Sequence, residues 1–277
     1  MRASPPVEVQ GSLPGSLRVS LQVAVNGSRG ATDGPAVPMS PQALAESALA
    51  AVAAGAGEVL VHPRTPCGGE SLSPRVVGPV LEVLRRAGVG VALTVPASIA
   101  AEPDPAARLE RVASWTVLPD RALVHFGEPG AGELARALLA RGVAVDAVVP
   151  LGGGAGPQPL ARFLAWPVRE PGRVRLSAEL ASADPALVAG LRGLPPVPVL
   201  LYGRDAAAWP VLRLAARCGT GVRTGVGDVT HLPDGQPARS NAELVAAARD
   251  MLAQTAPPPP APPASPAPPA PPTAASR

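Results

Sequence analysis

Lysine is absent from the 277-residue sequence, so all the basic side chains behind its net charge of +3 are arginines. A Schiff-base mechanism needs a lysine amine, and its absence excludes a class I aldolase mechanism. The Walker phosphate-binding motif also needs a lysine, so a P-loop nucleotide site is excluded as well. Composition alone therefore removes two common classes of enzyme.

Aromatic residues and cysteines are scarce. Aromatic residues make up 2% of the chain, and the arginines are scattered instead of clustering with them, so nucleic-acid binding has little support. The two cysteines, Cys67 and Cys218, lack CxxC spacing and fit free thiols in a reducing compartment. Residues 1–16 lack the features of a signal peptide, and no apolar run reaches the roughly 18 residues of a membrane span. We expect a cytoplasmic protein that binds neither nucleic acid nor membrane.

Composition divides the chain into three parts. Residues 255–277 are almost entirely proline, alanine, serine and threonine, which predicts a disordered, polyproline-like tail. Residues 1–16 are expected to form a flexible segment, and residues 17–254 a single folded domain. The proline runs of the tail also suit aromatic grooves that bind polyproline, although a flexible, solubilising extension is the simpler interpretation.

The folded part repeats one unit, in which a short β-branched run and a loop precede a helical stretch rich in alanine, leucine and arginine. The runs are mostly apolar, as parallel strands buried on both faces must be. About eight such units in roughly 240 residues predict a closed (β/α)8 barrel. The alternative is an open doubly wound sheet, which is weakened because no GxGxxG follows the first run. The expected strands are 17–25, 58–62, 89–95, 122–126, 143–149, 174–178, 197–202 and 221–225.

Local signals mark the ends of the expected helices. Ser40 and Ser73 each precede a proline, which is typical of a helix N-terminus, and Ser240 with Glu243 has the spacing of a capping box. Four glycines follow helical stretches at positions that favour a left-handed residue: Gly55, Gly88, Gly142 and Gly219.

Polar residues follow most of the expected strands. In a (β/α)8 barrel the reactive groups lie at the C-terminal ends of the strands, so these residues are predicted to face one another. Two of the three histidines are among them. The candidates are Asn26, Arg29, His62, Arg64, Thr94, His125, Glu128, Arg204, Asp205, Arg223 and Asp228.

Several long segments, in the correct order, resemble the β-keto acid cleavage enzyme family, whose founding activity is 3-keto-5-aminohexanoate cleavage. They include VAVNGSRGA at 23–31, VHPRTPCGGESL at 61–72, FGEPGA at 126–131 and much of 202–252. The resemblance implies a zinc-dependent barrel that condenses a β-keto acid with acetyl-CoA, giving acetoacetate and a new acyl-CoA. Its partners would be a small β-keto acid and a CoA thioester. Such barrels commonly associate, so a homo-oligomer is compatible with the sequence.

The family's metal ligands are two histidines of an HxH motif ending strand two and a glutamate of a GxED motif after strand eight. The corresponding positions here read Leu60-Val61-His62 and Gly225-Val226-Gly227-Asp228, so His62 alone is kept. The resemblance implies Asp228 as general base and Arg223 as the charge that positions a carboxylate. Further substrate-binding candidates are Asn26, Arg29, Arg64, Thr94 and His125.

These departures leave two hypotheses open. One is an active enzyme whose metal site is rebuilt from His62 and His125, with Asp228 or Glu128 as a further ligand. The other is a catalytically degenerate barrel that binds an acyl-CoA, a carboxylate or a partner protein. The glycine-rich stretch 151–156 can present backbone amides to a CoA phosphate, although a flexible loop explains it equally well.

Overall fold

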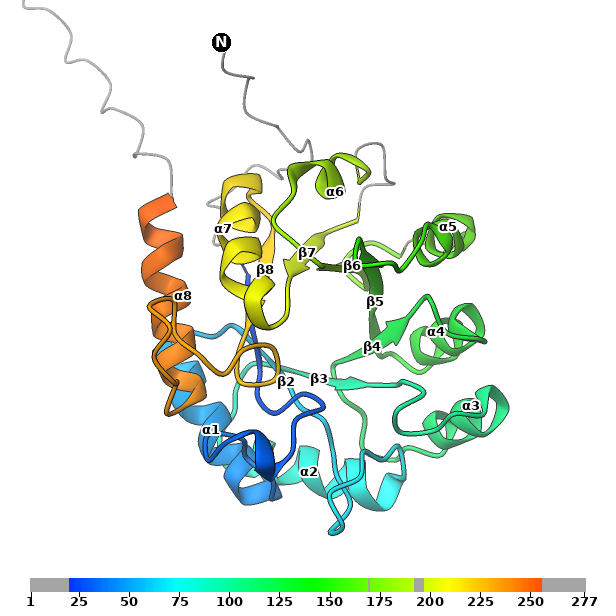
Figure 1. Cartoon of the computed structure of the whole chain (residues 1–277). Helices are drawn as coiled ribbons and strands as arrows, with labels where there is room; N and C mark the ends of the chain where they lie inside the picture. Colours follow the sequence, from blue (N-terminus) through cyan, green and yellow to red (C-terminus); the bar gives the residue numbers. More distant parts are fainter. Residues whose placement is uncertain (1–19, 169, 192–196, 256–277) are drawn as a thin grey trace, which may run out of the picture.

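The computed structural model describes residues 20–168, 170–191 and 197–255 (Figure 1). The expected N-terminal segment and the proline-rich tail lie outside these residues, apart from Thr255, which ends the last helix. Among the described residues, no helix has both the length and the apolar character needed to cross a membrane.

Eight parallel strands close into a barrel in sequence order, and the helices lie outside the ring of strands (Figure 1). The predicted (β/α)8 barrel is confirmed. The strands are β1 (Leu21–Ala24), β2 (Glu58–Leu60), β3 (Ala92–Pro96), β4 (Arg121–His125), β5 (Ala144–Leu151), β6 (Val174–Leu180), β7 (Val199–Tyr202) and β8 (Gly221–Thr224). The helices are α1 (Pro41–Ala54), α2 (Pro74–Arg86), α3 (Pro105–Ala113), α4 (Ala131–Ala140), α5 (Gln158–Ala165), α6 (Pro185–Ala189), α7 (Ala208–Cys218) and α8 (Asn241–Thr255), with 3-10 turns at Ala31–Asp33 and Asp205–Ala207.

The helix-end signals are largely confirmed. Ser40 accepts a hydrogen bond from the Ala43 amide at 3.1 Å, and Gly55 and Gly219 end their helices in the left-handed region. Ser73 precedes α2 but makes no side-chain capping bond. The capping box is half formed, because Ser240 accepts from the Glu243 amide while the Glu243 carboxylate accepts from the Arg239 amide instead.

Alternation along the strands separates two apolar regions. Residues that face outward pack against the helices and form the main core, as Val23, Val59 and Val145 do. Residues that face inward fill the barrel, and its middle is a small apolar layer of Ala24, Leu60, Leu123 and Val148. This layer separates two polar regions at the two ends of the barrel.

The N-terminal end of the barrel interior is filled by ion pairs. Arg175 contacts Glu58 at 2.7 Å and Asp146 at 2.6 Å, and Arg121 contacts Asp146 at 2.6 Å. Burial alone would raise the pKa of Glu58 and of Asp146, but the neighbouring arginines outweigh it and lower both pKa values. These charges neutralise one another, so this end of the barrel contributes to stability and the other end is left for function.

Candidate functional site

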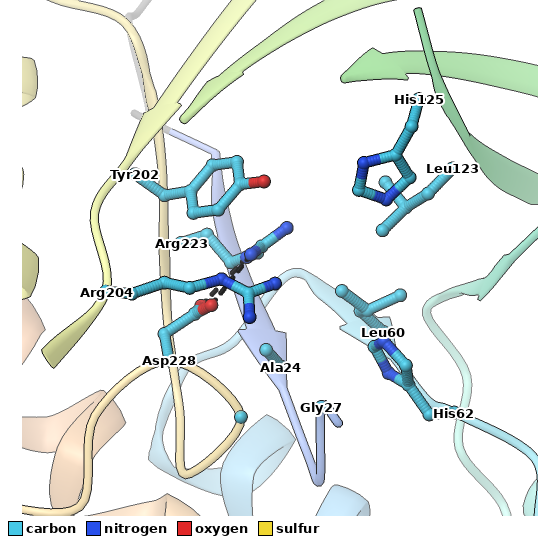
Figure 2. Close-up of a pocket in the computed structure, with 11 residues that line it drawn as sticks. Ala24, Gly27, Leu60, His62, Leu123, His125, Tyr202, Arg204, Arg223 and Asp228 are labelled. Atoms are coloured by element: carbon cyan, nitrogen blue, oxygen red, sulfur yellow. Dashed lines mark hydrogen bonds and ion pairs between the residues drawn. The ribbon is translucent and has the colours of Figure 1, made fainter. Parts of the chain in front are cut away.

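A pocket opens at the C-terminal end of the barrel (Figure 2). Its apolar residues Ala24, Leu60 and Leu123 belong to the middle layer of the barrel. The cavity volume is about 10 Å3, which is about the space that one water needs. The pocket is lined by Ala24, Gly27, Leu60, His62, Leu123, His125, Tyr202, Arg204, Arg223, Gly227 and Asp228.

Arg223 and Asp228 form a buried pair in the wall of this pocket. Arg223 Nε donates to Asp228 Oδ2 at 2.8 Å, and Nη2 donates to Oδ1 at 2.7 Å. The Arg223 guanidinium carbon lies 3.3 Å from the centre of the Tyr202 ring, in a cation–π contact. Arg223 Nη1 is buried and has no hydrogen-bond partner among the described residues. Figure 2 shows the terminal nitrogen that is not bonded to Asp228 directed toward the side where His125 lies. The pocket therefore holds an oriented cation with an unused donor.

Tyr202 and Arg204 contact a second carboxylate, Glu179. Tyr202 Oη donates to Glu179 Oε2 at 2.8 Å, and Arg204 Nε lies 3.4 Å from Glu179 Oε1. Burial raises the pKa of the Tyr202 phenol, so Tyr202 stays protonated and acts as a donor. The Arg204 side chain is 39% exposed, whereas that of Arg223 is 2% exposed. Arg204 is thus the less constrained of the two pocket cations.

The two pocket histidines are neutral near pH 7. Burial lowers the pKa of His62 well below its ordinary value, and the charges of Arg223 and Arg204 lower it further. Burial and the same two arginines lower the pKa of His125 to about 4. His62 Nδ1 is buried without a partner among the described residues. Both rings therefore offer dipoles, and not positive charge, to a ligand.

Asn26 and Thr94, both expected to bind substrate, are buried in bonds within the protein. Asn26 Nδ2 donates to the His62 carbonyl at 2.9 Å, and Asn26 Oδ1 accepts from the His62 amide at 2.9 Å. Thr94 is fully buried and lies 3.4 Å from Gln22 Nε2. Neither residue lines the pocket. Asn26 instead fixes the backbone of His62 and so positions that ring.

Arg29 and Arg64 form hydrogen bonds and an ion pair within the loops around the pocket. Arg64 donates to the carbonyls of Gly68 at 2.7 Å and of Gly27 and Arg29 at 2.8 Å each. Arg29 pairs with Asp205 and contacts the Asp228 carbonyl at 3.3 Å. Glu128, the other carboxylate considered for metal binding, pairs with Arg108 at 3.6 Å and is not among the residues that line the pocket. Of the residues predicted for the site, the structure brings His62, His125, Arg204, Arg223 and Asp228 together.

The residues present do not fit a zinc site. Catalytic zinc normally has three protein ligands and a water. Among the described residues, no group of three or more histidine, cysteine or acidic side chains is placed to hold a metal ion. The pocket offers His62 and His125, while both Asp228 oxygens accept bonds from Arg223 and Leu60 is part of the apolar layer. Cys67 is exposed and does not line the pocket.

The sequence profile of the beta-keto acid cleavage enzyme family matches residues 18–147 and 178–266. The chain belongs to this family. The predicted resemblance is therefore confirmed. The profile does not match residues 148–177, which include the glycine-rich stretch at the end of β5. No curated protein matches the chain.

Solved structures share the fold at low sequence identity. Apo ObcA is 14% identical with a TM-score of 0.57, covering 80% of this chain and 62% of ObcA. A ternary complex of ObcA with a C4-CoA adduct and oxalate is 15% identical with a TM-score of 0.57, covering 80% of this chain and 64% of that chain. The type I 3-dehydroquinate dehydratase from Clostridium difficile is 13% identical with a TM-score of 0.59, covering 90% of this chain and 96% of that chain. The chain thus spans less than two thirds of ObcA, and these likenesses concern the fold.

Sequence reasoning did not place Tyr202 and Glu179 in the site. The signal that would have found them is alternation, because both face the barrel interior at paired positions of β6 and β7. Glu179 also borders a second, larger cavity of about 350 Å3. That cavity is lined by Pro150, Leu151, Gly152, Gly153, Gly154, Ala155, Glu179 and Ala181. The glycine-rich stretch therefore lies beside the ion pairs of the pocket.

Proposed function

We propose that this chain is an active β-keto acid cleavage enzyme whose pocket binds an oxygen of a short β-keto acid. The observation that carries the proposal is Arg223, which Asp228 holds in place and whose buried Nη1 has no hydrogen-bond partner among the residues that the structure describes. A buried guanidinium N–H gives a strong, charge-assisted hydrogen bond to a carboxylate or a developing enolate. Family membership supplies the reaction class.

The proposed reaction exchanges acyl groups between carbon and sulfur. The bond between the keto carbon of the β-keto acid and its CH2 group breaks, and the released acyl group joins the CoA sulfur. The acetyl group of acetyl-CoA joins the CH2–carboxylate unit and gives acetoacetate, so all atoms are accounted for. Asp228 is the proposed base, which takes a proton from the CH2 group and returns it to that carbon when acetoacetate is released. It lies in the pocket, and each of its oxygens keeps a lone pair beyond the bonds from Arg223.

The second cavity is the proposed place for part of the CoA thioester. Its volume of about 350 Å3 lies in the range of small-molecule sites. Gly152, Gly153 and Gly154 adopt left-handed backbone conformations in succession, an arrangement that exposes backbone amides to an anion. The ternary complex of ObcA with a C4-CoA adduct and oxalate supports a pairing of CoA and carboxylate ligands on this fold.

A barrel that binds a carboxylate without turning it over is the second candidate function. Two features favour it: the described residues hold no three-ligand metal cluster, and both oxygens of the proposed base are engaged by Arg223. This candidate predicts ligand binding in the same pocket with no product.

The test is mass-spectrometric detection of new acyl-CoA after the full chain is incubated with acetyl-CoA and a panel of short β-keto acids. We expect product from at least one acid, and Asp228→Asn is expected to lower the rate by at least about 100-fold, as loss of general-base catalysis does. Arg239→Met, an exposed arginine paired with Glu243 at the start of α8, is the matched control and should keep the rate. No product from any acid, with binding retained, would support the second candidate instead.

A further inference from the structure

We infer that Arg223 and Arg204 take the place of a metal ion in this pocket, which makes it a metal-independent site for an oxygen of a small carboxylate or its enolate. The identity of the ligand rests on the proposed function. The metal independence rests on the geometry of the pocket itself.

The position of the third family ligand is closed to any side chain. A Cβ atom at Gly227 would lie 2.7 Å from the Gly27 amide nitrogen and 2.9 Å from the Gly27 Cα. In the opposite direction, a Cβ atom at Gly27 would lie 2.6 Å from the Gly227 Cα. The two loops are therefore in backbone contact, and a glutamate at 227 would need them to separate.

The charges around the pocket favour an anion over a cation. Arg29, Arg204 and Arg223 pair with Asp205, Glu179 and Asp228, respectively. Arg64 donates to backbone carbonyls and has no ion-pair partner among the described residues. Arg204 and Arg223 line the pocket itself, so a bound carboxylate would meet two guanidinium groups there. A divalent cation would instead lie beside two guanidinium groups and be repelled by them.

The unused polar atoms point to the same class of ligand. Arg223 Nη1 and His62 Nδ1 are buried without partners among the described residues, and both residues are more than nine-tenths buried. A buried donor without a partner destabilises the folded protein, and a ligand oxygen that accepts its hydrogen bond removes that cost. Arg223 Nη1 would donate a hydrogen bond to a ligand oxygen placed beside it. This bond would polarise the ligand's carbonyl, which is the role of the metal in the family.

Arg204 controls access to this position. The cavity of about 10 Å3 has room for about one water, so a keto acid needs more space than the described arrangement provides. Arg204 is the exposed member of the pair, and the one ion pair that it makes within the described part of the chain, with Glu179, is long at 3.4 Å. We therefore expect a ligand to displace this side chain on entry, with its guanidinium near enough to contact the bound anion.

The test measures binding of sodium acetoacetate to the full chain by calorimetry, after treatment with chelator and again with added ZnCl2. We expect the two dissociation constants to agree within about twofold. Arg223→Met is expected to weaken binding by at least about tenfold, the effect of losing one charge-assisted bond. Because that change leaves Asp228 buried without its partner, Arg204→Met serves as a second variant at an exposed position, with an expected loss of several-fold. Arg239→Met is the control and should bind normally.

Binding that requires zinc and disappears with chelator would overturn the inference. Unchanged binding in both arginine variants, or no binding of acetoacetate in either condition, would overturn it as well. Absence of turnover with metal-independent binding retained would contradict the proposed function and leave this inference standing.

Discussion

Arg223 donates two hydrogen bonds to Asp228, five residues further along the chain, across the turn that follows β8. The pair is buried, and its geometry leaves Arg223 Nη1 directed into the pocket. A single contact thus fixes the proposed base and orients the proposed anion-binding donor.

Breaking this pair should destabilise the protein. Arg223→Met leaves the Asp228 carboxylate buried and unpaired, and removal of one partner of a buried ion pair typically costs about 3–5 kcal/mol. We expect a loss of about 3 kcal/mol in the free energy of unfolding, measured by urea denaturation. The double variant Arg223→Met with Asp228→Asn should recover part of that loss. Equal stability of the single variant and the unaltered protein would show that the pair contributes nothing to folding.

The contact between Gly27 and Gly227 should not tolerate one methyl group. Gly227→Ala places Cβ 2.7 Å from a backbone nitrogen, and such overpacking costs about 1–3 kcal/mol or more. We expect a fall in thermal midpoint, together with weaker acetoacetate binding because the loop that carries Asp228 moves. Gly90→Ala is the control, since the nearest atom to its Cβ would lie 3.9 Å away. If both variants melt at the same temperature, the two loops are not in the close contact described.

The pocket histidines should make the protein sensitive to acid. The pKa values of His62 and His125 are lowered in the folded state, so the unfolded chain takes up protons first as the pH falls below about 6.5. Their contribution to stability is complete above that pH and is lost as the pH falls toward about 4 for His125. NMR titration should show two imidazoles without a shift change between pH 8 and about 5.5. His125→Asn should make the free energy of unfolding depend less on pH between about 6.5 and 4. An NMR titration midpoint near 6.5 for either ring would contradict the conclusion that both pocket histidines are neutral at pH 7.

The ion pairs at the N-terminal end of the barrel should be required for folding. Asp146→Asn removes the carboxylate that pairs with both Arg175 and Arg121. We expect the free energy of unfolding to fall by about 3 kcal/mol at neutral pH. Because the pKa of Asp146 is lowered by these arginines, its contribution is present above the unfolded value near 4 and is lost as the pH falls further. The difference in the free energy of unfolding between the unaltered protein and Asp146→Asn should therefore become smaller in acid. A difference that is independent of pH would exclude the charge as its cause.

The fold could be predicted from the sequence because its signals are local and repeated. One apolar run predicts a strand at 58–62, and β2 occupies Glu58–Leu60. The pocket residues His62, His125, Arg223 and Asp228 followed from their places at strand ends, since parallel strands bring those ends together.

Side-chain partners could not be predicted in the same way. Arg64 follows a strand end as His62 does, yet its guanidinium turns to three backbone carbonyls of neighbouring loops. Those acceptors come from segments far apart in the sequence, and their positions depend on loop conformation. The contact of Gly27 with Gly227 is of the same kind, because neither glycine carries a local signal for the other.

The most direct test of the proposed chemistry is acyl-CoA formation by chelator-treated protein supplied with acetyl-CoA and a panel of short β-keto acids, with elemental analysis confirming that zinc is absent. We predict product at a rate that added zinc does not raise and that Asp228→Asn lowers by at least about 100-fold. Product that appears only when zinc is restored, or a rate that the Asp228→Asn change leaves unaltered, would contradict a metal-independent reaction built on Arg223 and Asp228.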